Sequence, residues 1–172
     1  MTEAPVIREA ADTDLDAVAA FFWEGWRQAG PDAPGWSGAT EDVMAELTDP
    51  ETLRAQIGGP GRRMFLAWED GRVIAFAATR MMTPAVVEVA GIVVLQYALG
   101  RGVGSPLLET AVAASREAGF EQMVVRTEAD NDRAAGFYRS RGFTDDGAVT
   151  EVVEGIELDV LQFSRDLTFE PG

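Results

Sequence analysis

The sequence predicts an α+β fold, in which one mostly antiparallel sheet of about seven strands carries helices on both faces. Two observations support this class. The chain has 172 residues, of which 47% are apolar, and this is enough to bury one core. Strand-like and helix-like segments follow one another in the order β-α-α-β-β-β-α-β-α-β-β. Such mixing is typical of one sheet with helices packed on it, so we expect a single domain over residues 1–172.

The chain is predicted to begin with a strand and a helix. The short apolar segment at residues 6–9 is typical of a strand. Apolar side chains then recur at helical spacing, which predicts a helix that Thr13 or Asp14 caps and that ends near Gln28.

A loop and a second helical region are expected next. Residues 30–38 are rich in proline and glycine, and we expect a loop there in which Trp36 has a role. Residues 40–57 have a helical pattern, which Pro50 is expected to break because a proline inside a helix removes a backbone donor.

The middle of the chain is predicted to form strands. The segments at 64–68 and 73–79 are apolar and are separated by Asp70 and Gly71, a pair typical of a tight hairpin turn. The run at 86–94 is rich in β-branched residues and predicts a longer strand.

The last third of the chain alternates helices with strands. Residues 102–118 predict a helix that Gly119 ends, and a short helix at 131–141 is expected to end at Gly142. The remaining segments are β-rich and predict strands at 123–127, 144–153 and 156–164.

Three residue types are absent, and their absence excludes several chemistries. The chain has no Cys and no His, and all 14 basic residues are Arg. Disulfides, thiolate metal sites, cysteine nucleophiles and imidazole-based triads are therefore excluded, and so are Schiff bases on lysine. We expect no metal, and acid–base chemistry must come from carboxylates, tyrosine, water or backbone groups.

The excess of acidic over basic residues limits the kinds of partner that the protein can bind. With 29 acidic residues the net charge is -15, which disfavours nucleic acid because binding phosphates needs a basic face. No window approaches the roughly 18 consecutive apolar residues of a membrane span, and the N-terminus does not resemble a signal peptide. We expect a cytoplasmic protein, monomer or homodimer, whose composition also suits a salt-adapted cytoplasm.

The strongest signal is a glycine-rich passage between the strand at 86–94 and the helix that follows. Its glycines, at alternate positions, remove side chains from a turn that opens a helix, so that backbone N–H groups can point at an anion. Pro106 suits the first helical turn. The alternative is an ordinary tight turn, and a Rossmann fingerprint fits poorly because Ser105 stands where a glycine would be required.

A second segment makes the interpretation of the glycine-rich passage more specific. It reads Asn131-Asp132-Arg133-Ala134-Ala135-Gly136-Phe137-Tyr138-Arg139-Ser140-Arg141-Gly142-Phe143. Together the two segments resemble the GNAT superfamily of N-acetyltransferases. The family pattern Q/R-x-x-G-x-G/A corresponds to Leu99-Gly100-Arg101-Gly102-Val103-Gly104, with Leu99 as a departure. The pattern N-x-x-A-x-x-F-Y-x-x-x-G-F is matched throughout.

The resemblance implies where acetyl-CoA, the cosubstrate, is held. The diphosphate is expected at the backbone of Gly100, Arg101, Gly102, Val103, Gly104 and Ser105. The backbone of Ile92, Val93 and Val94 would pair with the pantetheine arm like an added strand. Asn131 would contact the arm from the other side. Arg133 is a candidate for the phosphates, although each arginine could instead pair with acidic side chains on the surface.

The resemblance also suggests two catalytic residues. Tyr138 corresponds to the family's proton donor to the departing thiolate; the alternative is a packed ring with a satisfied hydroxyl. Glu88 is the only charged residue in the run 85–95, where several family members carry a base. The alternative is a solvated residue on a strand face.

The predicted function is acetyl transfer from acetyl-CoA to a primary amine, most simply that of a small molecule. Two alternatives remain open: acetylation of a protein or peptide amine, and a non-catalytic module that binds acyl-CoA.

Overall fold

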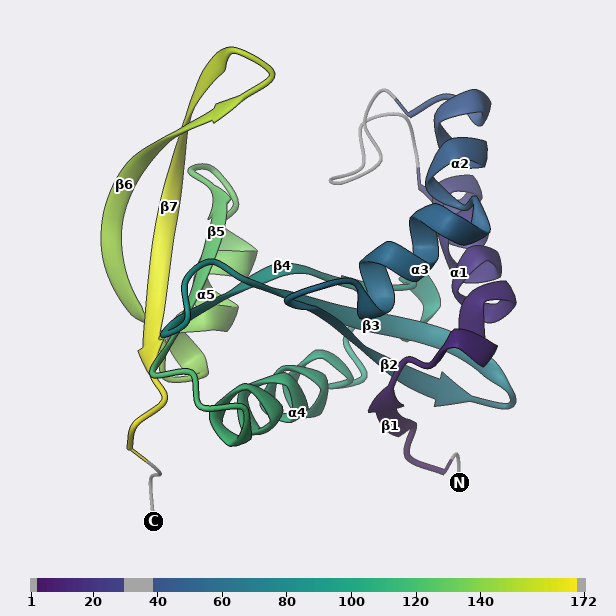
Figure 1. The fold of residues 1–172 in the computed structure, drawn as a ribbon, viewed down its shortest axis with the longest axis horizontal. Coiled ribbons are helices and arrows are strands. Elements are labelled where there is room, and N and C mark those ends of the chain that lie inside the picture. The colour runs from purple at the N-terminus through teal and green to yellow at the C-terminus, as the bar shows by residue number, and fades with distance from the viewer. Residues whose placement is uncertain (1–2, 30–38, 170–172) are drawn as a thin grey trace. The chain divides into compact units, whose positions relative to one another are not determined.

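The computed structural model describes residues 3–29 and 39–169, and the predictions for the loop at 30–38 and for Trp36 lie outside these residues. Across the described residues, seven strands form one sheet in the order β1-β2-β3-β4-β5-β7-β6, accompanied by five α-helices (Figure 1). The predicted fold class is confirmed. The chain consists of two compact units, Met1–Thr79 with Gly91–Ala111 and Arg80–Ala90 with Val112–Gly172; we call them the first and the second unit.

The first unit contains the N-terminal strand, three helices and a hairpin. Its elements are β1 (Val6–Glu9), η1 (Asp12–Asp14), α1 (Leu15–Gln28), α2 (Glu41–Leu47), α3 (Pro50–Gly58), β2 (Arg62–Glu69) and most of β3 (Arg72–Met81). The end of β4 (Val86–Val94), η2 (Gln96–Ala98) and the start of α4 (Gly104–Glu117) complete it.

The second unit contains the remaining parts of β3, β4 and α4 and four further elements: β5 (Gln122–Glu128), α5 (Asp132–Ser140), β6 (Thr144–Val153) and β7 (Ile156–Asp166). β4 runs parallel to β5, whereas β7 is antiparallel to both β5 and β6. β6 and β7 form a long hairpin (Figure 1). All strand predictions are confirmed to within a few residues at their ends.

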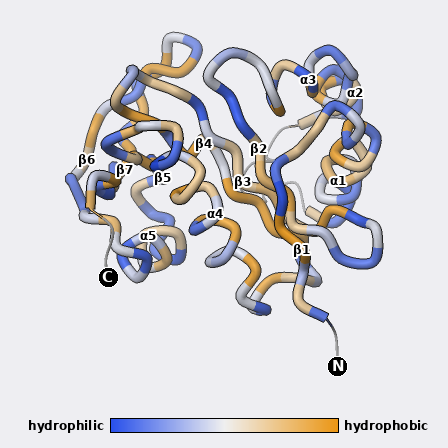
Figure 2. Tube along the Cα trace, turned by 60° about the horizontal axis from the view of Figure 1, so that its bottom comes forward, coloured by the Kyte–Doolittle hydropathy of each residue, from blue (hydrophilic) through white to orange (hydrophobic). Residues whose placement is uncertain are grey.

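The core of the first unit forms between helices α1 and α3 and strands β2 and β3. Of the apolar stripe predicted for α1, Val18 is buried, and Leu15, Ala19 and Phe22 are partly buried against the same cluster. The cluster also contains Phe21, which the spacing did not single out, and side chains of α3 and the hairpin. The ring of Phe21 meets that of Phe76 edge to face, with centroids 5.5 Å apart. Figure 2 shows the hydrophobic character of β2 and β3, against the hydrophilic turns around them. Burial of these side chains supplies most of the driving force for folding.

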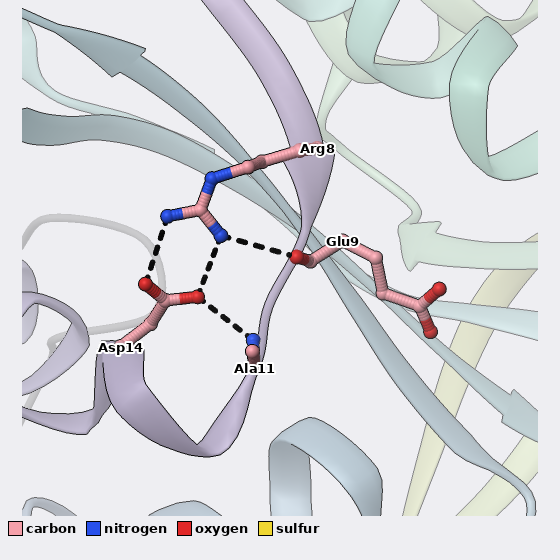
Figure 3. A network of polar contacts seen from close by, with 4 residues as sticks. All are labelled: Arg8, Glu9, Ala11 and Asp14. Atoms are coloured by element: carbon pink, nitrogen blue, oxygen red, sulfur yellow. Dashed lines mark hydrogen bonds and ion pairs between the residues drawn. The ribbon is translucent and has the colours of Figure 1, made fainter.

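The connection from β1 to α1 is fixed by an ion pair (Figure 3). Arg8 donates from Nη1 to Asp14 Oδ2 at 2.7 Å and from Nη2 to Oδ1 at 2.8 Å, and the backbone N–H of Ala11 donates to Oδ2 at 2.8 Å. The Arg8 guanidinium lowers the pKa of the Asp14 carboxyl. Asp14 thus takes the predicted N-cap position of α1, but its carboxylate bonds backward to the preceding turn and not to the helix.

The break predicted at Pro50 is confirmed. Pro50 is the first residue of α3, where its missing N–H costs nothing. The Asp49 carboxylate accepts hydrogen bonds from the N–H groups of Glu51 and Thr52 at 3.1 and 3.3 Å and so caps the new helix.

The predicted hairpin turn is also present. Asp70 and Gly71 have φ of 49° and 75°, the pair of positive angles that matches the twist of the flanking strands. Gly119, with φ of 93°, ends α4 as expected. α4 itself begins at Gly104, two residues later than predicted, because Gly102 has φ of 76° and stays outside the helix.

Candidate active site

The glycine-rich passage forms a turn that leads into α4 in the first unit. Gly100 and Gly102 both have φ of 76°, a region that L side chains rarely adopt. Among residues 3–29 and 39–169, and apart from the two adjacent residues, no atom lies within 4 Å of the position that a Cβ would take at either glycine. The glycines are therefore required by the backbone conformation, and the space beside them is open.

The start of α4 presents free backbone donors. Within the described part of the chain, the N–H groups of Gly102, Val103, Gly104 and Ser105 have no hydrogen-bond acceptor. Pro106 follows, and the backbone bond from Leu107 N to Val103 O is 3.4 Å long. Consecutive free N–H groups at the positive end of a helix dipole are suited to an anion. Of the predicted phosphate-binding residues, 102–105 thus present backbone donors suited to a diphosphate group, whereas the N–H of Arg101 donates to Ala98 O.

Arg101 projects from this turn to the end of β2. Its guanidinium binds the Glu69 carboxylate through both terminal nitrogens, with Nη1 and Oε2 3.2 Å apart and Nη2 in contact with Oε1. The hydrogen bond to Arg101 lowers the pKa of Glu69. In the structure the charge of Arg101 is therefore neutralised by an acidic partner.

The predicted arm-binding residues lie at the end of β4. Pairing between β4 and β5 covers Val86–Val89 only, and the last pair joins Val89 to Val125, although β4 continues to Val94. Ile92, Val93 and Val94 are half-buried and lie beyond this ladder. A strand whose ladder stops before its end offers backbone groups to an extended ligand.

Glu88 is buried, contrary to the alternative of a solvated residue. It lies opposite Val124 of β5 in the second unit and is 5% exposed. Arg80 Nε donates to Glu88 Oε2 at 2.7 Å. Glu88 is thus a buried carboxylate held in an ion pair with Arg80.

Tyr138 is a packed residue of α5 in the second unit. It is 7% exposed, and its ring contacts Phe143 and Phe163 with centroids 5.5 and 6.2 Å apart. Burial raises the pKa of Tyr138 to about 12. The phenol is therefore protonated near neutral pH and able to donate a hydrogen bond.

Asn131 and the arginines of the second segment have different environments. Asn131 caps α5, since its Oδ1 accepts a hydrogen bond from Ala134 N at 3.1 Å, and its amide nitrogen has no acceptor among the residues that the structure describes. Arg139 binds Asp145 at 2.7 Å and stacks on Phe163. Arg133 is exposed and has no partner among the described residues. Arg133 thus stays a candidate for binding the phosphates of CoA. Arg139 instead pairs with an acidic side chain on the surface, the alternative considered for each arginine.

Sequence reasoning missed three residues around these positions: Glu69, Arg80 and Thr127. The first two are the ion-pair partners of Arg101 and Glu88. Thr127 is 9% exposed, and its Oγ1 is one of two buried side-chain polar atoms without a partner in the described residues. It lies on the same face of β5 as Val125, which pairs with Phe163. Arg80 lies eight residues before Glu88, directly after the strand predicted at 73–79.

The high pKa of Tyr138 can be measured because little else titrates at alkaline pH. The chain has two tyrosines and no Lys, Cys or His. In the Tyr97→Phe variant, phenolate absorbance should rise with a midpoint near pH 12, the pKa of Tyr138. This raised pKa contributes about 3 kcal/mol of stability, present in full below pH ~10 and lost as pH rises through the folded-state pKa. A midpoint near pH ~10 while the protein is still folded would contradict the burial of the hydroxyl.

A comparison with known protein families identifies the family of this chain. A model of the acetyltransferase (GNAT) family matches residues 16–143. The chain belongs to the GNAT family of acetyltransferases. It is therefore an acyltransferase, and the family predicted from the two segments is confirmed. No curated protein sequence is significantly similar to this chain.

Solved structures of GNAT proteins share the fold. The putative acetyltransferase yncA from Salmonella typhimurium, solved with its cofactor acetyl-CoA, is 22% identical with a TM-score of 0.70, covering 99% of this chain and 98% of that one. A phosphinothricin acetyltransferase from Sinorhizobium meliloti in complex with AcCoA has the same identity and TM-score, covering 99% and 94%. The ribosomal-protein-S18-alanine N-acetyltransferase of Escherichia coli is 18% identical with a TM-score of 0.69, covering 97% and 96%.

Two further structural properties bear on the expected partners. Within residues 3–29 and 39–169, none of the helices has the length and apolar character that crossing a membrane requires. The same residues contain no cluster of three or more acidic side chains with the geometry to hold a metal ion.

Proposed function

We propose that this GNAT acetyltransferase moves the acetyl group of acetyl-CoA to a primary amine of a small molecule, in one domain made of both units. The observation that carries the proposal is the set of free N–H groups at the start of α4, directly after a turn with two glycines at positive φ. This donor set suits the diphosphate of acetyl-CoA. When bound, acetyl-CoA supplies a thioester that is activated for attack by an amine.

The backbone binds the anionic part of this substrate. The N–H groups of residues 102–105 hold the diphosphate, and the helix dipole of α4 stabilises its charge. Backbone recognition matters in a protein with a net charge of -15, because local donors must compensate for a repulsive surface. The backbone of Ile92, Val93 and Val94 binds the pantetheine arm, and the amide nitrogen of Asn131 donates to it.

Tyr138 is the proposed general acid. Its hydroxyl stays protonated because burial raises the pKa to about 12. A neutral phenol donates a hydrogen bond toward the sulfur as negative charge develops there, and this stabilises the transition state more than the ground state.

Glu88 is the proposed general base. An ammonium has no free electron pair, so the attacking amine must first lose a proton. The Glu88 carboxylate accepts this proton directly or through water. The contact with Arg80 at 2.7 Å holds the carboxylate in one orientation.

Acetylation of a protein or peptide amine is the second candidate. The matched structures include an enzyme named for phosphinothricin and one named for an alanine of a ribosomal protein, and both have the same fold as this chain. The fold alone therefore does not select between the two classes of acceptor. A screen of small amines and peptides for release of CoA separates these candidates, and binding of CoA without release would favour the non-catalytic module.

The variant Gly104→Asp tests the proposal. It places a carboxylate at the first residue of α4, beside the free N–H groups, so the affinity for acetyl-CoA should fall at least about tenfold. Calorimetry with acetyl-CoA measures this directly. The matched control is Gly58→Asp, which adds the same charge in open space at the end of α3 and should bind like the wild type. Equal affinities in all three folded proteins would refute the diphosphate site.

A further inference from the structure

We propose that Glu69 is a positioning residue for the diphosphate of acetyl-CoA: it binds Arg101 and thereby holds the turn at residues 99–105 in the conformation that presents the free N–H groups. This inference rests on the proposed function. It also gives Arg101 a role that differs from direct phosphate binding.

The contact between the two side chains has the geometry of a fixed pair. Both terminal nitrogens of Arg101 contact the carboxylate of Glu69, and only 15% of the Glu69 side chain is exposed. Two parallel contacts between planar groups restrict rotation more than a single contact does. Glu69 is the last residue of β2 and directly precedes the hairpin turn, so it is attached to regular structure.

The turn at residues 99–105 needs such a contact because its glycines give the backbone a large conformational freedom. Arg101 stands between Gly100 and Gly102, and apart from the adjacent residues no atom of the described chain lies within 4 Å of the position of a Cβ at either glycine. Ordering glycine costs more conformational entropy than ordering other residues. The backbone bond from Arg101 N to Ala98 O is long, at 3.4 Å. The bond to Glu69 therefore restricts the turn before any ligand binds.

The same geometry argues against direct phosphate binding by Arg101. A guanidinium recognises phosphate through the paired nitrogens that Glu69 already occupies. The hydrogen bond between them also raises the pKa of Arg101 and lowers that of Glu69, so both groups stay charged and paired. Attraction of the diphosphate is then left to the backbone N–H groups, which the pair keeps in place.

A double-mutant cycle distinguishes the two roles of Arg101. If the pair positions the turn, Glu69→Gln and Arg101→Gln should each weaken binding of CoA by about fivefold, the upper range for an ion pair near the protein surface. The double variant should bind no more weakly than either single variant, because both changes remove one contact. Arg101→Lys keeps the charge but not the paired geometry, and it should resemble Arg101→Gln. Calorimetry with CoA and with pantetheine, which lacks phosphate, gives the readout, and pantetheine affinity should not change.

The chain contains a matched control. Glu9 and Arg63 form a second exposed pair in the same unit, also with two contacts, each at 2.8 Å. Glu9→Gln should leave CoA binding unchanged. Three results would overturn the inference and assign Arg101 to the phosphates. They are tighter binding of CoA by Glu69→Gln, additive losses of affinity in the double variant, and wild-type affinity in Arg101→Lys. If Glu69→Gln is poorly folded, the two Arg101 variants decide alone. Absence of CoA binding by the wild type would instead refute the proposed function.

Discussion

Replacing Tyr138 by Phe is expected to lower kcat by about 10²- to 10⁴-fold, the range for loss of a general acid. The variant keeps the ring that packs against Phe143 and Phe163 and removes only the hydroxyl. Because that hydroxyl interacts mainly with charge that develops during reaction, the KM for acetyl-CoA should change little. Steady-state kinetics with an accepted amine measure both parameters.

Tyr97→Phe is the control for this experiment, because it removes the hydroxyl of the only other tyrosine of the chain, which is exposed. Its kcat should equal that of the wild type. A Tyr138→Phe rate within about twofold of the wild type would show that another donor, such as water, protonates the thiolate.

Replacing Glu88 by Gln is expected to lower kcat/KM by about 10²-fold or more. Gln has nearly the same shape, and its oxygen still accepts the hydrogen bond from Arg80 Nε, so the fold should be retained. The variant cannot accept a proton. The limb of the pH–rate profile on which activity rises with pH should therefore shift or vanish, while acetyl-CoA binding persists.

Glu117→Gln is the matched control for Glu88→Gln, since Glu117 is an exposed residue at the end of α4. It should keep the wild-type profile. If Glu88→Gln also keeps the acidic limb unchanged, Glu88 is a structural partner of Arg80, and the base must be sought among the other carboxylates.

Local sequence signals predicted the elements well where the backbone demands particular residues. The turn at Asp70 and Gly71 and the helix start at Pro50 both follow from restrictions on φ that are readable from the sequence. α4 was predicted to start too early because helical spacing does not reveal that Gly102 has positive φ. Element boundaries depend on such single dihedral angles.

The environment of the site could be predicted less well than its residues. The two sequence segments identified the residues of the glycine-rich turn and of α5. Their ion-pair partners could not be predicted, because ion pairing depends on strands that only the fold brings together. Glu69 and Arg101 are separated by 32 positions, and nothing local in the sequence couples them. The burial of Glu88 was likewise hidden, because a lone carboxylate in an apolar strand is compatible with either face of a sheet.

We propose that this GNAT protein transfers acetyl groups from acetyl-CoA to primary amines. The most direct measurement is mass spectrometry of a panel of small amines and peptides after incubation with acetyl-CoA and the wild-type protein. Gly104→Asp and Tyr138→Phe serve as paired controls. We expect at least one acceptor to gain one acetyl group with stoichiometric release of CoA, and to gain it much more slowly with either variant. Acetylation at equal rates by the wild type and both variants, or tight binding of acetyl-CoA with no acetylated acceptor, would contradict it.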